Sequence, residues 1–177
     1  MKEKIEVLDY AEVILRALPQ GILLNTQAER FNSMVIGWGH LGTLWSMPTF
    51  HVYVREHRFT KEQMDKTDTF SISVPLGDPD PEITRVCGMQ SGRNIDKVKE
   101  LGLTLEEPDI IKTPGIKEYP LTIECEKLYA QAQVLEDIPE PIRSTMYPQD
   151  VDVTNPLANK DVHTMYVGKI VSAYIIR

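Results

Sequence analysis

The sequence predicts a mainly β fold, an antiparallel barrel whose strands are joined by short helices. Segments such as 49–55 and 70–74 alternate apolar and polar residues with the period of two that a half-buried strand shows. Early strands at hairpin-like spacing and long strands near the end favour an antiparallel barrel over a parallel α/β sheet. The chain of 177 residues suits one domain, 1–177, with a full core.

Composition limits the partners that this chain can attract. The formal net charge is -7 and the pI is about 5.1, so we expect no broad attraction to nucleic acid or to an anionic membrane. No apolar run approaches the ~20 residues of a membrane span, and acidic residues interrupt the N-terminal segment. The expected location is the cytoplasm. Cys87 and Cys125 are interpreted as buried thiols, with a redox pair as the alternative.

Capping residues predict four short helices. Asp9, with Glu12 three residues on, has the pattern of a capping box, and Pro19 ends the helix that follows. A second predicted helix starts at Thr60, with Gln63 as its capping partner, and a third starts at Pro81, after Asp80. A fourth spans 94–101 and ends at Gly102.

Strands account for most of the rest. The strand over 121–135 changes its apolar phase after Cys125, which predicts a β-bulge. Glu124 and Glu126 alternate with the core face and are expected in solvent. Further strands are predicted at 21–26, 32–39, 49–55, 70–74 and 165–176, the last one apolar on both faces, and loops at 108–119 and 139–159.

Two cationic turns are candidate anion sites. Arg58 offers a planar fork of donors, and Thr60 follows where a helix begins, an arrangement suited to a phosphate. The alternative is an exposed basic loop paired with surface carboxylates. The second turn, residues 89–97, combines Ser91 and Gly92 with the cations Arg93 and Lys97, and a plain turn between helices is its alternative.

A glycine-bearing strand, 32–39, is a candidate resting place for a planar ring. Gly37 and Gly39 leave flat backbone there, and Trp38 or Trp45 could wall a ring, although core aromatics are the alternative. The run 37–42 approaches a Gly-x-Gly-x-x-Gly spelling but lies in no βαβ unit. His40, His51 and His57 lack the spacing of metal ligands, and no catalytic triad is evident.

Taken together and in this order, these segments resemble the flavin reductase-like family, which includes the flavoredoxins. The resemblance covers about residues 19 to 130, and His163 through Gly168 is similar to the family's closing strand. The matching segments are Asn32 to Gly39, Trp45-x-x-Pro48, Val54-Arg55-x-x-Arg58-x-Thr60, Phe70 to Pro75, and Cys87-Gly88-x-x-Ser91-Gly92-Arg93-x-x-Asp96-Lys97.

The resemblance implies a Greek-key split barrel that binds FMN at the interface of a homodimer. It implies that His163 lies on the nicotinamide side. It also implies a role for each matching segment in holding FMN. The isoalloxazine ring would be lined by Asn32, Ser33, Met34, Val35 and Ile36, beside Trp38. The phosphate would be held by Arg55, Arg58 and Thr60, and further contacts to phosphate or ring would come from Ser91, Gly92, Arg93 and Lys97.

Val35 departs from the family, in which many members have threonine at this place. A side-chain hydroxyl contact to the flavin would therefore be missing, whereas backbone contacts would remain. The resemblance implies an enzyme in which NADH or NADPH reduces flavin and electrons pass to an acceptor. The alternatives are a non-enzymatic FMN electron carrier reduced by a redox partner protein, and a structural barrel that has lost its site.

Overall fold

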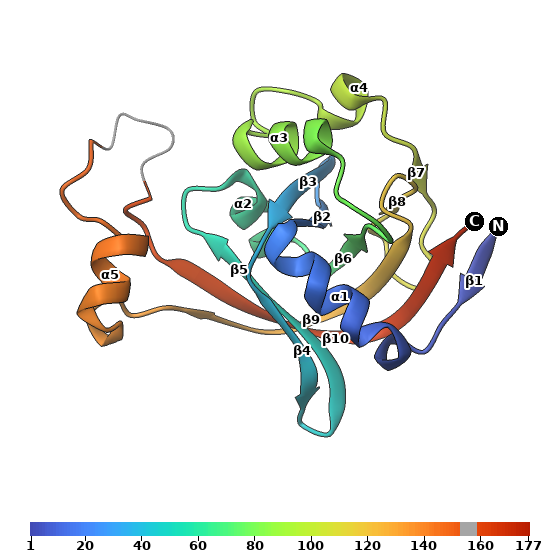
Figure 1. Cartoon of the computed structure of the whole chain (residues 1–177), viewed down its shortest axis with the longest axis horizontal. Coiled ribbons are helices and arrows are strands. Elements are labelled where there is room, and N and C mark those ends of the chain that lie inside the picture. Colours follow the sequence, from blue (N-terminus) through green and yellow to red (C-terminus); the bar gives the residue numbers. More distant parts are fainter. Residues whose placement is uncertain (153–158) are drawn as a thin grey trace.

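The computed structural model describes residues 1–152 and 159–177. Its body is one antiparallel sheet in the order β3-β2-β6-β9-β10-β5-β4, with β1 paired to β10 (Figure 1). The strands are β1 Lys2–Lys4, β2 Ile22–Gln27, β3 Phe31–Ile36, β4 Gly39–Leu44, β5 Met47–Arg55, β6 Thr69–Val74, β9 Leu121–Ala132 and β10 His163–Ile176, and a separate small sheet joins β7 Leu105–Glu106 to β8 Gly115–Ile116.

The sheet curls into an open barrel. β3 and β4 are its two edges, and no pairing joins them in the described part of the chain. Apolar side chains from α1 and the strands fill the interior, where burial supplies the main stabilisation. The largest residues fully buried in that core include Phe50, Phe70 and Tyr166.

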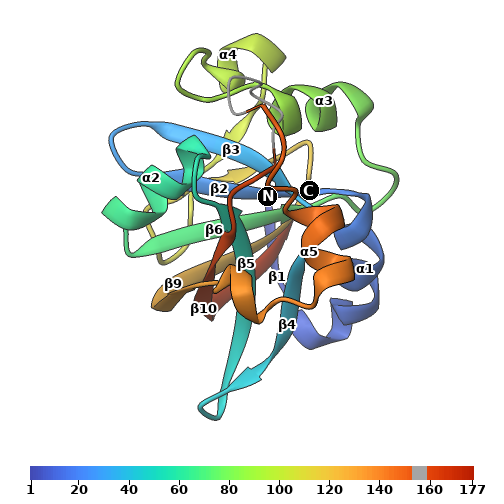
Figure 2. The ribbon, with the colours of Figure 1, turned by 90° about the vertical axis from the view of Figure 1, so that its left-hand side faces the viewer.

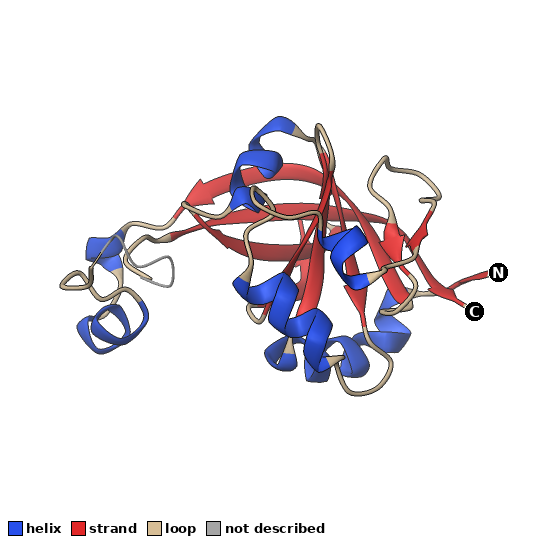
Figure 3. Ribbon diagram, turned by 90° about the horizontal axis from the view of Figure 1, so that it is seen from above, coloured by secondary structure: helices blue, strands red, loops and turns tan. Residues whose placement is uncertain are grey.

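The helices lie outside the curved sheet (Figure 3). α3 and α4 contact β3 and each other, above β2 and β3 in Figure 2. A second apolar cluster, which includes Leu23, Ile83 and Cys87, fills the space under α3. The helices are α1 Ala11–Ala17, α2 Phe59–Lys66, α3 Pro81–Met89, α4 Lys97–Leu101 and α5 Glu140–Met146, with short 3-10 turns at Val7–Tyr10, Leu18–Gln20 and Leu135–Asp137.

The predicted bulge in β9 is confirmed. Lys127 pairs with Gly168 and Tyr129 with Val167, so Leu128 is the extra residue. β10 carries a second irregularity, between Ile170 and Ser172. Beyond Leu128 the two strands continue as an arm that leads to α5 (Figure 1).

Several local predictions at helix starts are wrong. Asp9 lies in a 3-10 turn and caps nothing, and α1 begins without a side-chain cap. Thr60 is inside α2, where its hydroxyl accepts a hydrogen bond from Asn32. By contrast, Pro81 begins α3 as predicted, and the structure adds that the Asp80 carboxylate caps this helix. Gly102 ends α4 with a left-handed φ of 63°.

Helix α5 corrects the expectation of a loop over 139–159. Pro141 stands in the first turn of this helix, where a backbone N–H would have no intrahelical hydrogen-bond partner. The prolines that suggested a loop therefore include one that begins a helix. Residues 153–158 of the predicted loop lie outside the described residues. No helix in the described ranges combines the length and the apolar character needed to cross a bilayer.

Glu124 is fully buried, contrary to the expectation that it is solvated. The alternation placed it correctly on the face opposite the core, but the 108–112 segment covers that face. Its carboxylate accepts hydrogen bonds from the backbone N–H groups of Asp109, Ile110 and Ile111, at 2.6, 2.9 and 3.2 Å. These bonds satisfy the buried charge and fix the segment to β9.

We expect Glu124→Gln to lower the free energy of unfolding by about 2 kcal/mol, because an amide replaces one acceptor oxygen with a donor that faces backbone N–H groups. Urea denaturation measures the change. Glu126→Gln is the matched control, an exposed glutamate of the same strand, and should change stability by less than about 0.5 kcal/mol. Equal effects of the two substitutions would contradict this account.

Candidate functional site

Two adjoining cavities open where β3 faces β5 and β10. The first, about 230 Å³, is lined by the end of β3 together with Tyr53, Arg55 and His163. The second, about 380 Å³, lies between β3, the start of α2 and residues 88–95, which are the end of α3 and the turn after it (the 88–95 loop). Met34, Arg58 and Gly88 line both cavities, which therefore form one cleft.

The structure brings nearly all predicted site residues to this cleft. The exception is Ser33, whose buried hydroxyl has no hydrogen-bond partner in the described chain. The first cavity takes Met34, Val35, Ile36, Trp38, Arg55, Arg58 and His163, and the second takes Asn32, Met34, Arg58, Thr60, Ser91, Gly92, Arg93 and Lys97.

Arg58 carries the charge that is available to a ligand. It is half-buried, precedes the first residue of α2, and lines both cavities. Its guanidinium has no hydrogen-bond or ion-pair partner among residues 1–152 and 159–177. The first N–H groups of α2 lack intrahelical partners and add partial positive charge beside it. This end of the cleft therefore suits a phosphate.

Lys97 and Arg55 are buried cations bonded to backbone carbonyls. The Lys97 ammonium donates to the carbonyl oxygens of Ser33 and Cys87, at 2.8 and 3.2 Å, and so ties β3 to α3. Burial lowers the pKa of Lys97 to about 8, which leaves it mainly protonated at pH 7. Arg55 donates to the carbonyls of Met146, Asn159 and Asp161.

The cleft is therefore electropositive although the whole chain is acidic. Carbonyl dipoles satisfy the donors of Lys97 and Arg55 but do not cancel their charge. Neither cation has a carboxylate ion-pair partner within the described residues, and Arg58 adds a third charge. Arg93 is different, because its guanidinium pairs with Glu62 and donates to the His57 carbonyl.

Gly92 lets the second cationic turn pack against β3 and α2. A Cβ atom at this position would lie 2.1 Å from Asn32 Oδ1 and 2.8 Å from a ring carbon of Phe59. Asn32 also donates to the Thr60 hydroxyl, at 2.9 Å. The 88–95 loop, β3 and α2 are thus held at contact distance, which brings Ser91 to the same cleft as Arg58.

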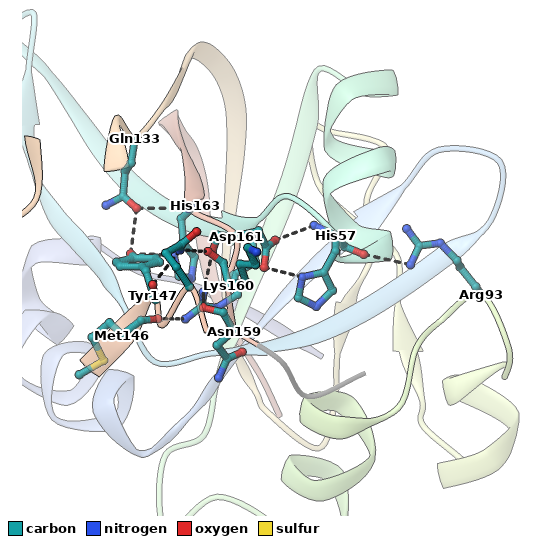
Figure 4. A network of polar contacts seen from close by, with 11 residues as sticks. His57, Arg93, Gln133, Met146, Tyr147, Asn159, Lys160, Asp161 and His163 are labelled. Carbon is teal, nitrogen blue, oxygen red and sulfur yellow. Dashed lines mark hydrogen bonds and ion pairs between the residues drawn. The ribbon is translucent and has the colours of Figure 1, made fainter. Parts of the chain in front are cut away.

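His163 lines the first cavity and belongs to the network of polar contacts in Figure 4. Its Nδ1 lies 3.0 Å from the Tyr147 hydroxyl, and its ring lies 4.7 Å from the Trp38 ring between centroids. Burial, followed by the positive charge of Arg55, lowers the pKa of His163 to about 4. This histidine is therefore neutral at physiological pH.

The two tryptophans have different places. Trp38 is 41% exposed and lines the first cavity, as predicted. Trp45 is 58% exposed at the tip of the β4–β5 hairpin, contacts Tyr129 and lines neither part of the cleft. It therefore does not wall a ring within this chain.

Sequence reasoning missed several residues that line or support the cleft. Tyr53 lies two residues before Arg55 on β5 and therefore shares its face, so the period of two carried a signal for it. Tyr147 and Asn159 lie within the second long connection, 139–159, where no periodicity or motif marked them. Gly88 was part of the quoted resemblance but was given no role.

The cysteines do not form a redox pair in this structure. Cys87 is buried under α3 and Cys125 in the barrel core, and both are free thiols. Burial raises the pKa of both, which keeps them protonated and unreactive. In the described ranges, no three His, Cys, Asp or Glu side chains gather as metal ligands would.

The donor set of the cleft fits a phosphorylated planar ligand. One end holds a guanidinium at a helix start that nothing else in the described part of the chain pairs, and the other holds apolar and aromatic walls with backbone at Gly37 and Gly88. Such a cleft can orient an anionic ligand and shield part of it from water. Among the described residues that line it, no nucleophile is paired with a base.

Solved structures with this architecture are split barrels. The flavoredoxin of Desulfovibrio vulgaris (Miyazaki F) is 21% identical, with 89% of this chain and 69% of that chain covered and a TM-score of 0.64. An FMN-binding domain of a flavin reductases-like enzyme from Shewanella baltica OS155 is 16% identical, covering 99% and 77%, at 0.66. The Streptomyces globisporus C-1027 NADH:FAD oxidoreductase is 13% identical, covering 94% and 84%, at 0.63.

The open barrel, its short helices and these likenesses define a split-barrel protein. The flavin reductase like domain matches residues 15–177, and the chain belongs to that family. No curated protein matches the sequence.

We expect Gly92→Ala to lower the free energy of unfolding by about 2 kcal/mol or more, because the added methyl group overlaps Asn32 and displaces the 88–95 loop. Thermal or urea unfolding measures this, and hydrogen exchange of the loop shows where the change occurs. Gly77→Ala is the control, since a Cβ there meets nothing within 4 Å. A Gly92→Ala protein as stable as the control would refute the close packing described here.

Proposed function

We propose that this protein binds FMN in the cleft, catalyses the NAD(P)H-dependent reduction of flavin, and passes the electrons to an acceptor. One observation carries the proposal. The guanidinium of Arg58, which has no partner among the described residues, stands at the start of α2 in a cleft continuous with the aromatic wall of Trp38. Membership of the flavin reductase like family supports the same chemistry.

At the phosphate end, Arg58 and the backbone N–H groups at the start of α2 would bind the anion, with Ser91 on the facing loop. At the ring end, the backbone of Met34 to Gly37 would line the isoalloxazine, with Trp38 and Tyr53 limiting access of water. Val35 offers no hydroxyl, so the backbone supplies the polar contacts along this strand.

FMN, when bound, supplies the hydride- and electron-accepting chemistry. The residues around it supply orientation and charge. Lys97 and Arg55 keep net positive charge in the low-dielectric walls, which favours a ligand that gains negative charge on reduction. His163 stays neutral and so can act only through hydrogen bonding or packing.

We also propose that the protein works as a homodimer. The far half of β9, the residues just after it and the tip of the β4–β5 hairpin expose apolar side chains, with Leu128 41%, Val134 50% and Trp45 58% exposed. Exposed apolar surface of this kind marks an interaction site. A second copy of this chain is the partner that the resemblance implies, with FMN beside the interface.

A non-enzymatic electron carrier is the alternative. The likeness to the flavoredoxin of Desulfovibrio vulgaris favours it. In that case a partner protein, rather than a nicotinamide, would reduce the bound FMN. The two functions share the cleft and differ in the source of electrons.

The enzymatic function is tested by mixing the purified chain with FMN and NADH or NADPH and following nicotinamide absorbance. We expect oxidation far above that of FMN and nicotinamide without protein. Tight, yellow FMN without nicotinamide oxidation would support the carrier instead. A colourless protein that does not bind added FMN would exclude both the enzyme and the electron carrier. It would support a structural barrel that has lost its site.

Arg58→Ala should weaken FMN binding by about 10- to 100-fold, because a charge-assisted bond to phosphate contributes about 1.5–3 kcal/mol. Riboflavin, which lacks the phosphate, should bind both proteins equally. Quenching of flavin fluorescence measures both affinities. Arg85→Ala is the control, because Arg85 forms an exposed ion pair with Glu82 outside the cleft. Equal losses for FMN and riboflavin would contradict a phosphate role.

The homodimer predicts a mass of two chains in light scattering, and Leu128→Lys should shift it toward one chain by placing a charge in the apolar contact. Glu126→Lys, an exposed position two residues earlier on the same strand, is the control for a change of charge alone. A wild-type protein that remains a monomer at high concentration would exclude the dimer.

A further inference from the structure

The ring of His163 ends a chain of hydrogen bonds that comes from the arm. Gln133 Oε1 accepts from the backbone N–H of His163 at 3.2 Å and from the Tyr147 hydroxyl at 2.9 Å. The Tyr147 oxygen in turn lies 3.0 Å from His163 Nδ1. Tyr147 is 2% exposed, so these contacts are shielded from water (Figure 4).

The direction of each bond follows from its donors. A backbone N–H can only donate, which identifies the Gln133 atom as the carbonyl oxygen. Because Tyr147 has one hydroxyl proton and donates it to Gln133, its oxygen is an acceptor toward His163. The proton of the neutral imidazole is therefore on Nδ1, and Nε2 carries the lone pair.

Of the two ring nitrogens of His163, Nε2 is the one that remains for a ligand. Nδ1 is occupied by Tyr147, Nε2 has no hydrogen-bond partner among the described residues, and His163 lines the first cavity. Arg55 helps to hold Tyr147 in place, because its guanidinium donates to the Met146 carbonyl and lies over the Tyr147 ring, 5.0 Å from the ring centroid.

We propose that Gln133 and Tyr147 are positioning residues that hold His163 as the Nδ1–H tautomer, so that Nε2 presents a hydrogen-bond acceptor to a ligand N–H or O–H group. The cleft then has two opposite polarities. The Arg58 end selects an anion, and the His163 end selects a neutral donor and disfavours a carboxylate or carbonyl. The tautomer is independent of the ligand, whereas the choice of a nicotinamide amide as the donor rests on the proposed function.

The tautomer can be read directly from long-range ¹H–¹⁵N spectra of the full chain, labelled at its four histidines. Loss of signals in His163→Gln assigns the residue. At pH 7 we expect a pyrrole-type Nδ1 and a pyridine-type Nε2. A wild-type protein with the proton on Nε2 would overturn the proposal.

Tyr147→Phe should shift the population toward Nε2–H, since the acceptor for Nδ1–H is gone. Gln133→Glu should retain the wild-type spectrum, because a carboxylate still accepts both bonds, whereas Gln133→Leu should not. The matched control is Tyr129→Phe, which removes a Tyr–Gln bond of the same kind, Tyr129 to Gln131 at 2.7 Å, on exposed β9. An unchanged tautomer in both Tyr147→Phe and Gln133→Leu would overturn the positioning role, even if one variant folds poorly.

Ligand polarity is tested on the FMN-loaded chain with NAD⁺ and its 3-acetylpyridine analogue, which lacks the amide N–H. We expect NAD⁺ to bind about fivefold more tightly and to shift the His163 Nε2 resonance. Equal affinity with no difference in that resonance would overturn the acceptor role. If neither nucleotide binds while FMN does, the enzymatic function fails, and the tautomer measurement still decides the positioning role.

Discussion

Two buried cations that bond to backbone carbonyls, and to no carboxylate among residues 1–152 and 159–177, hold the cleft together. Lys97 joins β3 to α3, and Arg55 joins β5 to the segment that follows α5, both through backbone carbonyls. Burying a charge is costly unless its hydrogen bonds are satisfied, and these carbonyls satisfy the donors without neutralising the charge. The same contacts therefore fix the shape of the cleft and leave it positive. An acidic protein can in this way contain a local site for an anion.

The opening of the barrel between β3 and β4 explains why residues far apart in the sequence form one site. β3 and β4 follow each other in sequence but do not pair, so the last residues of β3 face β5 and β10 across the gap. Strands supply flat backbone on this side, and helix α2 supplies charge and N–H groups. The division of the cleft into a ring end and an anion end follows from this arrangement.

Periodicity and motif spacing predicted the strands, a bulge in β9 after Cys125, the start of α3 at Pro81 and most of the residues that line the cleft. They failed where a distant segment determines the outcome. Glu124 was placed on the correct face, but alternation cannot reveal that the 108–112 segment covers it. Lys97 was identified as a charge, but its carbonyl partners lie far away in sequence. Tyr147 had no signal, because its role depends on how α5 packs.

The two bulges of the β9–β10 ribbon lie on opposite strands, and so they cancel. Leu121 pairs with Ile175 and Ala132 with Thr164, so equal lengths of chain join the two ends although the middle is offset by one residue. Removing Leu128 alone would leave the second bulge, between Ile170 and Ser172, uncompensated. The part of β9 beyond position 128 would then shift by one residue relative to β10. Gln133 and His163, which exchange backbone and side-chain bonds just beyond, would then no longer meet. An irregularity in the middle of a ribbon thus sets the alignment at its end.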